Sequence, residues 1–233
     1  MQSLVDHIIE FLENNADPGR IVMAGKSYPT KSRVIGVIVP KIKILLKEVK
    51  QEIKSFTPSE KIELAKNLVN TGIFECQQLA YEYLGNDKKA LNAITEKDVD
   101  ELGQNLDNWV AVDYYAGLIV GYAWREGILS SKKIKSYLES DDHWIRRIAV
   151  VSTVSLNQKA RGGTGDSDRT LEICRLVIDD HQEMITKALS WALRELAKIE
   201  AEPVVDFVQK YKDRLHRRVL REVKHKLDFG TKN

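Results

Sequence analysis

The sequence predicts an all-α protein built as a solenoid of antiparallel helical hairpins. Apolar residues recur at intervals of three and four through nearly the whole chain, which is the spacing of amphipathic helices. The 233 residues include only 5 prolines and 13 glycines, fewer than a strand-rich protein with many tight turns usually has. Shorter polar helices alternate with longer apolar ones, which is how hairpins stack into a solenoid. We therefore expect a single domain over residues 1–233.

The first helices are predicted from apolar spacing and from residues that favour helix starts. Leu4 to Leu12 has helical spacing, and so does Pro40 to Lys54, where the proline suits a first helical turn. Thr57 is followed three residues later by Glu60, which predicts a capping box for the next helix. The β-branched run Val34–Val39 is the one ambiguous segment.

The rest of the chain alternates short and long helices. Thr95 and the pair Ser130 and Ser131 are further candidate N-caps. The long helices begin at intervals of about 30 to 41 residues, within the range of helical-repeat proteins. The short helices are predicted over 59–70, 95–104, 131–139, 168–180 and 202–211, and the long ones from near Phe74, Trp109, Trp144, Ile185 and Leu215.

Two segments break the helical pattern. The stretch from Asn157 to Asp168 is rich in Gly, Ser and Asp and is predicted to be a mobile loop. The run from Gly19 to Ser27 resembles a phosphate-binding loop, but it has five residues between Gly19 and Gly25 where the motif has four, and a helix precedes it. A basic turn beside DNA is a better functional interpretation, and an ordinary connection between helices is favoured over both.

Composition and charge exclude several classes of protein. The chain is 30% charged and 43% apolar with a net charge of +2, as in ordinary globular proteins. Cys76 and Cys174 lie far apart and outside any CxxC motif, which gives no support to a disulfide framework or a zinc site. No apolar run approaches the roughly 18 residues that span a membrane, and the N-terminal stretch does not have the order of a signal peptide. We expect a cytoplasmic monomer with no membrane partner.

Two tryptophans have polar neighbours at helical spacing. Trp109 and Asp113 are four residues apart, and therefore share one helix face. On these residues alone, a partly buried indole and a solvated or arginine-paired carboxylate are the favoured interpretation. Lys187, Trp191 and Arg194 also share a face, away from the apolar face of their helix. That placement of Trp191 is harder to explain by packing.

Basic residues gather in the second half of the chain. Arg146 and Arg147 point about 100° apart on a helix, so one can contact a partner while the other pairs locally. Between Lys210 and Lys226 only two acids oppose a series of Lys and Arg that includes Arg218 and Arg221. Such a cluster is typical of proteins that bind a phosphate backbone. We favour nucleic-acid binding on a concave basic face over a merely solubilising helix.

Four segments together resemble the AlkD-type DNA alkylation repair glycosylases, whose fold is a solenoid of HEAT-like repeats. The segments lie in the family's order along the chain, and none is specific alone. They are GVIVPKIKILLKEV from Gly36, NWVAVDYYAG with Trp109 and Asp113, DDHWIRRIAVVS with Arg147, and KALSWALRELAK with Trp191.

The resemblance implies excision of cationic N3- or N7-alkylated purines from double-stranded DNA, with little or no base flipping and with no metal or cofactor. It implies that Trp109 and Trp191 pack against the deoxyribose and flank the lesion. Asp113 would stabilise an oxocarbenium-like sugar and position water, and Arg147 would hold the phosphate backbone. Tyr28 would lie beside the damaged strand.

Two alternatives remain open beside the glycosylase. One is a non-enzymatic protein that binds branched or bent DNA, and the other is a protein-interaction scaffold. The pair Trp109 and Asp113 favours the enzyme over the first. Lys187, Arg194, Arg218 and Arg221 are candidate DNA contacts. The basic C-terminal helix favours both DNA-binding hypotheses over the second.

Overall fold

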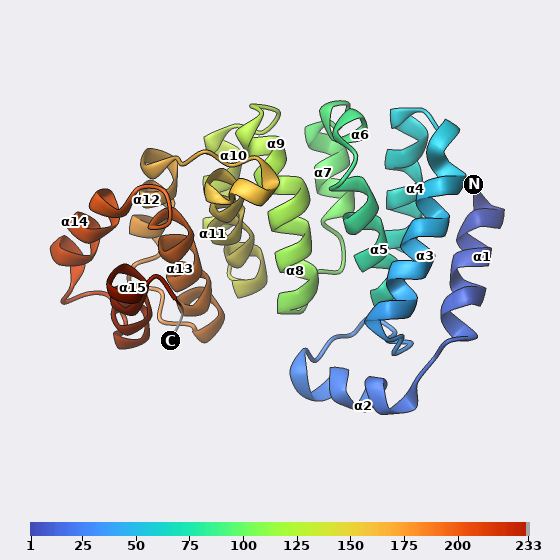
Figure 1. Cartoon of the computed structure of the whole chain (residues 1–233), viewed down its shortest axis with the longest axis horizontal. Coiled ribbons are helices and arrows are strands. Elements are labelled where there is room, and N and C mark those ends of the chain that lie inside the picture. The colour runs from blue at the N-terminus through green and yellow to red at the C-terminus, as the bar shows by residue number, and fades with distance from the viewer. Residues whose placement is uncertain (232–233) are drawn as a thin grey trace. The chain divides into compact units, whose positions relative to one another are not determined.

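The computed structural model describes residues 1–231, and these residues contain helices and no strand (Figure 1). The all-α class is therefore confirmed, and the predicted long helices begin within two residues of the expected positions. The α-helices are α1 (Gln2–Glu13), α2 (Pro18–Ser27), α3 (Val39–Glu52), α4 (Pro58–Asn70), α5 (Phe74–Leu84), α6 (Lys88–Asn92), α7 (Glu96–Leu102), α8 (Trp109–Tyr115), α9 (Gly121–Arg125), α10 (Ser131–Ser136), α11 (His143–Asn157), α12 (Ser167–Leu176), α13 (Glu183–Leu196), α14 (Ala201–Tyr211) and α15 (Arg217–Phe229).

The chain divides into two compact units, Met1–Ile119 and Val120–Asn233. The division falls within a π-helical stretch, Ala116–Val120, that follows α8. In the first unit α5 is the central helix, and it packs against α3, α4 and α8. Its buried tyrosines reach neighbouring helices, because the Tyr81 hydroxyl donates to the Leu102 carbonyl and the Tyr83 hydroxyl to the Lys61 carbonyl, both at 2.7 Å.

The second unit is organised around α11 and α13, which pack along each other. α12 lies against both helices, and α15 packs on α13. On the other side of α11, α9 approaches closely at Gly121, where a Cβ atom would lie 2.7 Å from the Ser152 carbonyl oxygen. Only glycine fits at that position without moving one of the two helices.

The predicted helix caps are present. Thr57 and Glu60 form a reciprocal capping box at the start of α4, and Thr95 forms another at the start of α7. The Ser130 hydroxyl accepts from the Lys133 amide at the start of α10, while Ser131 is the first residue of that helix. Local sequence therefore sets these helix ends.

The expectation of a loop or turn over Gly19–Ser27 is wrong, because these residues form most of α2. The Asp17 carboxylate accepts from the Gly19 amide at 2.8 Å and Pro18 occupies the first turn, which together favour a helix start. A helix over these residues also removes the resemblance to a phosphate loop. The ambiguous run Val34–Val39 forms no strand, and only Arg33 pairs with Ile73 in an isolated bridge.

The predicted loop after α11 is present and has several attachments. Asn157 is buried, and its side chain accepts from the Asp166 amide at 3.0 Å. The Arg125 guanidinium donates to the carbonyls of Ser155 and Arg161 at 3.2 and 2.8 Å. These bonds hold both ends of the loop to the helices of its unit.

Cys76 and Cys174 are buried and free, one in each unit. Burial raises the pKa of the Cys76 thiol to about 12, so it stays protonated at neutral pH. Through residue 231, no helix combines the length and the apolar character needed to cross a membrane.

Candidate nucleic-acid interface

Trp109 and Asp113 occupy the accessible face of α8, as their spacing predicts. Ala111 and Val112 of the same helix are buried, whereas Asp113 is partly accessible and Trp109 is 39% exposed. Asn108 caps the helix, because its side-chain oxygen accepts from the Ala111 amide at 3.0 Å. The cap fixes the direction in which α8 begins, and with it the position of the indole.

Tyr28 lies against Trp109. The two rings meet edge to face, with centroids 6.5 Å apart, and Tyr28 also stacks on Phe74 at 4.9 Å. Burial raises the pKa of the Tyr28 hydroxyl, and the nearby Glu75 carboxylate adds to that rise. Two predicted site residues that are 81 positions apart in the sequence therefore form one aromatic cluster.

Hydrogen bonds tie the end of α2 to the start of α8. The Trp109 Nε1 donates to the Ser27 carbonyl at 3.0 Å. The Asp107 carboxylate accepts from the Thr30 hydroxyl at 2.6 Å and from the Lys31 amide at 2.5 Å. We call these two bonds to Asp107 the Asp107 clamp. Asp107 is not among the predicted site residues, because nothing local in the sequence marks a carboxylate whose partners lie 76 and 77 residues away.

A second carboxylate holds the chain after Tyr28. Glu75 is buried at the start of α5 and accepts from the amides of Ile35, Gly36 and Val37 at 3.1, 2.6 and 3.4 Å. Gly36 has a φ of +86°, and a Cβ there would lie 2.6 Å from the Asp17 carbonyl oxygen. The segment that leads into α3 is therefore anchored both to α5 and to the start of α2.

A cleft of about 170 Å³ lies beside this aromatic cluster. Its lining combines aromatic rings, carboxylates, an amide and cations. It includes Val110 and Tyr114, which stand on the accessible face of α8 beside Trp109 and Asp113. The other lining residues are Arg20, Tyr28, Gly36, Val37, Val39, Ile42, Lys43, Phe74, Glu75, Gln78 and Glu82.

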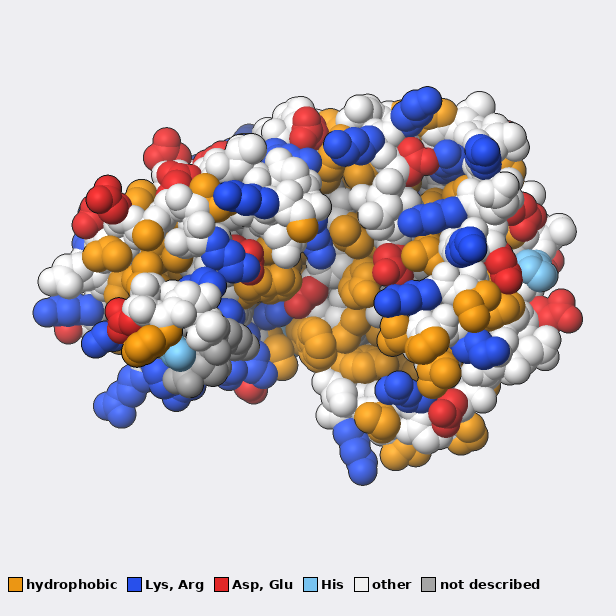
Figure 2. All heavy atoms as spheres, viewed as in Figure 1, with side chains coloured by type: hydrophobic (Ala, Val, Ile, Leu, Met, Phe, Trp, Pro, Cys, Tyr) orange, Lys and Arg blue, Asp and Glu red, His pale blue; other side chains and the backbone are white. Residues whose placement is uncertain are grey.

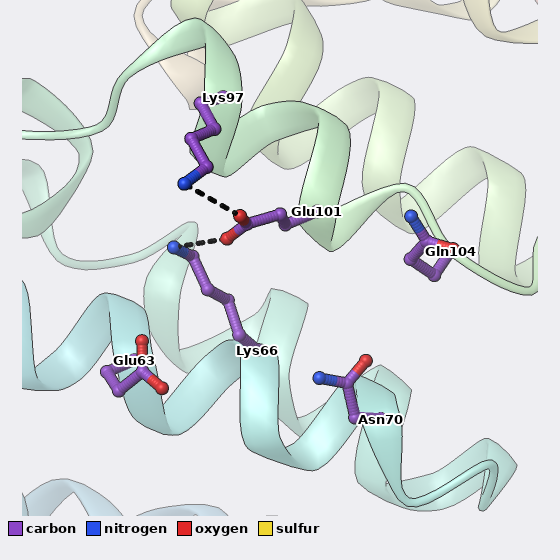
Figure 3. A pocket seen from close by; sticks show the side chains of 6 residues that line it. All are labelled: Glu63, Lys66, Asn70, Lys97, Glu101 and Gln104. Carbon is purple, nitrogen blue, oxygen red and sulfur yellow. Dashed lines mark ion pairs between the residues drawn. The ribbon is translucent and has the colours of Figure 1, made fainter.

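A larger hollow of about 520 Å³ lies between α4 and α7 and is lined by polar residues (Figure 3). Lys66 and Lys97 both point at Glu101, with Nζ–Oε distances of 2.5 and 3.6 Å. Lys66 also pairs with Asp98 at 2.5 Å. Since these cations are matched by carboxylates, the hollow offers little net charge to a polyanion, and ion pairing between the two helices explains its composition.

In the second unit, Lys187, Trp191 and Arg194 share the accessible face of α13. All the remaining side chains from residue 185 to residue 196 are buried, so the predicted face is the one that reaches solvent. The Trp191 Nε1 donates to the buried Glu195 carboxylate at 3.3 Å, four residues along the helix. Lys187 pairs with Glu183 at 2.6 Å. Glu195 is not among the predicted site residues, although its i+4 spacing from Trp191 places the two side chains on one helix face.

Arg194 and Arg218 converge on one buried carboxylate. Glu222 accepts from Arg218 Nε at 2.8 Å and from the Ser190 hydroxyl at 2.6 Å, and Arg194 NH2 lies 3.8 Å away. Burial lowers the pKa of the Arg194 guanidinium, which the Glu222 charge partly offsets. These contacts join α13 to α15, and the three charged groups sum to one positive charge.

Arg147 lies within the packing of α11 and α13. It is 5% exposed, and its guanidinium donates to the Met184 carbonyl. Arg146 also pairs locally, with Nε 2.8 Å from Asp180. The sequence predicts that one of the two arginines contacts a partner while the other pairs locally. In the structure both side chains make contacts within their own unit.

Helix α15 carries several of the accessible cations of this unit. Arg217, Arg221 and Lys224 are exposed, while Lys226 donates to the Gly230 carbonyl. Arg214, just before the helix, pairs with Asp179 at 3.0 Å. Figure 2 shows blue side chains gathered over the region of α15. Arg221 is thus the predicted DNA-binding arginine with the most accessible position.

No group of three or more His, Cys, Asp or Glu side chains within residues 1–231 is arranged to hold a metal ion. The chemistry available at the two accessible tryptophans is that of a carboxylate, aromatic faces and nearby cations. Such groups can stabilise a developing positive charge and contact a phosphate backbone.

Comparison with known proteins identifies the family. The sequence model of the DNA alkylation repair enzymes matches residues 8–227, which is nearly the whole chain. A search of curated proteins finds no match. Because the match includes every candidate residue described above, the chain belongs to the DNA alkylation repair enzyme family.

Proposed function

We propose that this chain is an AlkD-type DNA glycosylase that excises cationic N3- or N7-alkylated purines from duplex DNA. The proposal rests on one observation above all. In a member of the DNA alkylation repair family, Trp109 and Asp113 share an accessible helix face with Tyr28 packed beside the indole. Membership of the family supports a role in DNA repair, and these residues suggest the reaction.

The proposed reaction is hydrolysis of the glycosidic bond. When the C1′–N bond breaks, its electron pair stays with the purine and neutralises the positive charge of the alkylated base. Positive charge then develops on the deoxyribose, where the Asp113 carboxylate stabilises it. A water molecule that Asp113 positions adds to C1′ and loses a proton to the solvent, while the alkylated purine leaves as a neutral base. Trp109 and Trp191 pack against the sugar, and their ring faces favour the cationic transition state.

The remaining predicted residues are proposed to bind the DNA backbone. Arg221 and Lys187 have accessible ammonium or guanidinium groups, whereas Arg194 and Arg218 act together through the positive charge they retain around Glu222. Tyr28 would contact the damaged strand beside Trp109. Arg147 would contribute least, because little of its side chain is accessible.

We further propose that residues 1–233 form one domain of HEAT-like repeats with a concave basic face. The support lies within the units, where consecutive helices pack against each other as pairs, as α4 does on α5 and α12 on α13. Such pairs are the building blocks of helical solenoids.

The proposal is tested by single-turnover release of 7-methylguanine from a duplex. Asp113→Asn should keep DNA affinity and lower the release rate by about 10²–10³, the usual cost of removing one preorganised electrostatic group. Asp6→Asn, at an exposed carboxylate of α1, is the matched control and should release the base at the wild-type rate. Equal rates for Asp113→Asn and wild type would remove Asp113 from the mechanism.

Salt dependence separates DNA binding from a protein-scaffold role. Affinity for duplex DNA should fall steeply as salt rises, because cations of the protein displace counterions from phosphates. A flat dependence would argue against a basic footprint. Steep dependence without base release by the wild type would instead support a non-enzymatic DNA-binding protein.

A further inference from the structure

α2 exposes apolar side chains that its own unit does not cover. Ile21, Val22 and Met23 are 42, 60 and 56% exposed, and Ala24 is the one buried residue of the helix. Successive residues of a helix point about 100° apart, so these three side chains cover much of its circumference. A surface helix normally turns its apolar residues toward the core. Packing within the unit therefore does not explain them, and Figure 2 shows apolar surface where α2 lies.

The surroundings of this apolar surface are basic. From residue 14 to residue 33 the chain carries Arg20, Lys26, Lys31 and Arg33, and Asp17 is its single acid. Asp17 is engaged in capping α2. Arg33 pairs with Glu13 at 2.8 Å, while the side chains of Arg20 and Lys26 are exposed. Apolar residues flanked by cations favour a polyanionic partner that also offers apolar surface.

The position of α2 links it to the proposed lesion site. Its last residue, Ser27, accepts the hydrogen bond of the Trp109 indole, and the next residue is Tyr28. The Asp107 clamp at one end and Gly36 against the Asp17 carbonyl at the other fix both ends of the helix. A helix held in this way is already ordered, so its exposed side chains can contact a partner without the entropy cost of folding on binding.

We propose that α2 inserts Val22 and Met23 into the minor groove of duplex DNA, with Lys26 on the adjacent phosphates. Minor-groove proteins use aliphatic wedges of this kind between base steps, together with Arg and Lys. The sugars that line the groove give the apolar side chains a surface to pack against. The inference rests on the proposed function in so far as duplex DNA is the substrate.

The test compares two double variants by fluorescence anisotropy on an undamaged duplex. Val22→Gln/Met23→Gln replaces the two apolar side chains, which we call the wedge, with a residue that favours helix. Leu176→Gln/Val205→Gln is the matched control, since these apolar residues are 47 and 48% exposed in the second unit. We expect the dissociation constant to rise about tenfold for the first variant and less than about twofold for the control. Netropsin, which occupies the minor groove, should weaken wild-type binding and affect the wedge variant much less.

Several outcomes would overturn the inference. Equal affinities of wild type and wedge variant would do so, as would insensitivity of wild type to netropsin. Binding to phosphatidylserine vesicles that depends on Val22 and Met23, with unchanged duplex binding, would assign α2 to a membrane surface instead. Circular dichroism and the single variant Met23→Gln guard against a folding defect.

The two proposals can fail separately. Wild type that binds the duplex through α2 but releases no 7-methylguanine keeps the wedge and loses the glycosylase. Wild type that releases the base while the wedge variant binds equally well keeps the glycosylase and loses the wedge.

Discussion

Asp107→Ala should loosen the segment after α2 without unfolding the unit that contains it. The substitution removes the acceptor for the Thr30 hydroxyl at 2.6 Å and for the Lys31 amide at 2.5 Å. A hydrogen bond to a charged group contributes about 1.5–3 kcal/mol. Lys31 is exposed and Thr30 is only partly buried, so water replaces much of the lost hydrogen bonding. We therefore expect the free energy of opening this segment to fall by about 1–2 kcal/mol. The loss should appear as local opening, since no core side chain changes.

Hydrogen exchange measures that opening directly. Protection of the Lys31 amide should fall by about tenfold, which corresponds to about 1.4 kcal/mol, while the amides of α5 keep theirs. Trp109 fluorescence should shift to longer wavelength as Ser27 and Tyr28 move away from the indole. If the Tyr28 and Trp109 cluster contacts the lesion, the rate of 7-methylguanine release should also fall in Asp107→Ala.

The control is Asp98→Ala in the same unit. That change removes the carboxylate that accepts from the Thr95 amide and hydroxyl in the capping box of α7, and with it the pair with Lys66. It therefore destabilises the unit without touching the clamp. It should leave Lys31 exchange and Trp109 emission as in wild type. Unchanged protection of Lys31 in Asp107→Ala, or equal losses across α5 in that variant, would contradict this prediction.

Three further perturbations test the ion pairs and buried groups. Glu222→Gln should lower the free energy of unfolding by about 2–4 kcal/mol, because two arginines lose their buried counter-charge; an unchanged urea midpoint would contradict this. Arg147→Met keeps the aliphatic stem but removes the guanidinium that donates to the Met184 carbonyl, so calorimetry should show a loss of about 1–3 kcal/mol. Burial raises the pKa of the Asp98 carboxyl, but its bonds to Lys66 and Thr95 outweigh this and leave the pKa below the ordinary value. Asp98 therefore stabilises the fold above about pH 4, and that contribution is lost as pH falls through its folded pKa. The drop in urea midpoint between about pH 5 and about pH 3 should be smaller in Asp98→Asn.

Helix ends and helix faces could be predicted because their causes are local. Thr57 and Glu60 are three residues apart, and the side chain of each accepts a hydrogen bond from the backbone amide of the other. Trp191 could be assigned to the accessible face of its helix because burial follows the 3.6-residue period along all of α13.

The features that could not be predicted from the sequence are of two kinds. Two carboxylates bind partners far away in the chain, and one helix has almost no buried face. Asp107 and Glu75 bind backbone amides 76 and 39 residues away, and no local pattern encodes such a pairing. α2 escaped prediction because only Ala24 is buried, so its apolar residues have no helical period to detect. Asp17 and Pro18 were the available signal for a helix start.

The anchoring of α2 at both ends has a consequence for how this part of the sequence can change. Since the helix contributes one small side chain to the core, folding places little demand on its other side chains. Replacing Arg20 to Met23 with other helix-forming residues should therefore leave thermal stability nearly unaltered. The segment is an exchangeable element, through which the binding preference of the enzyme could be re-engineered without repacking its helices.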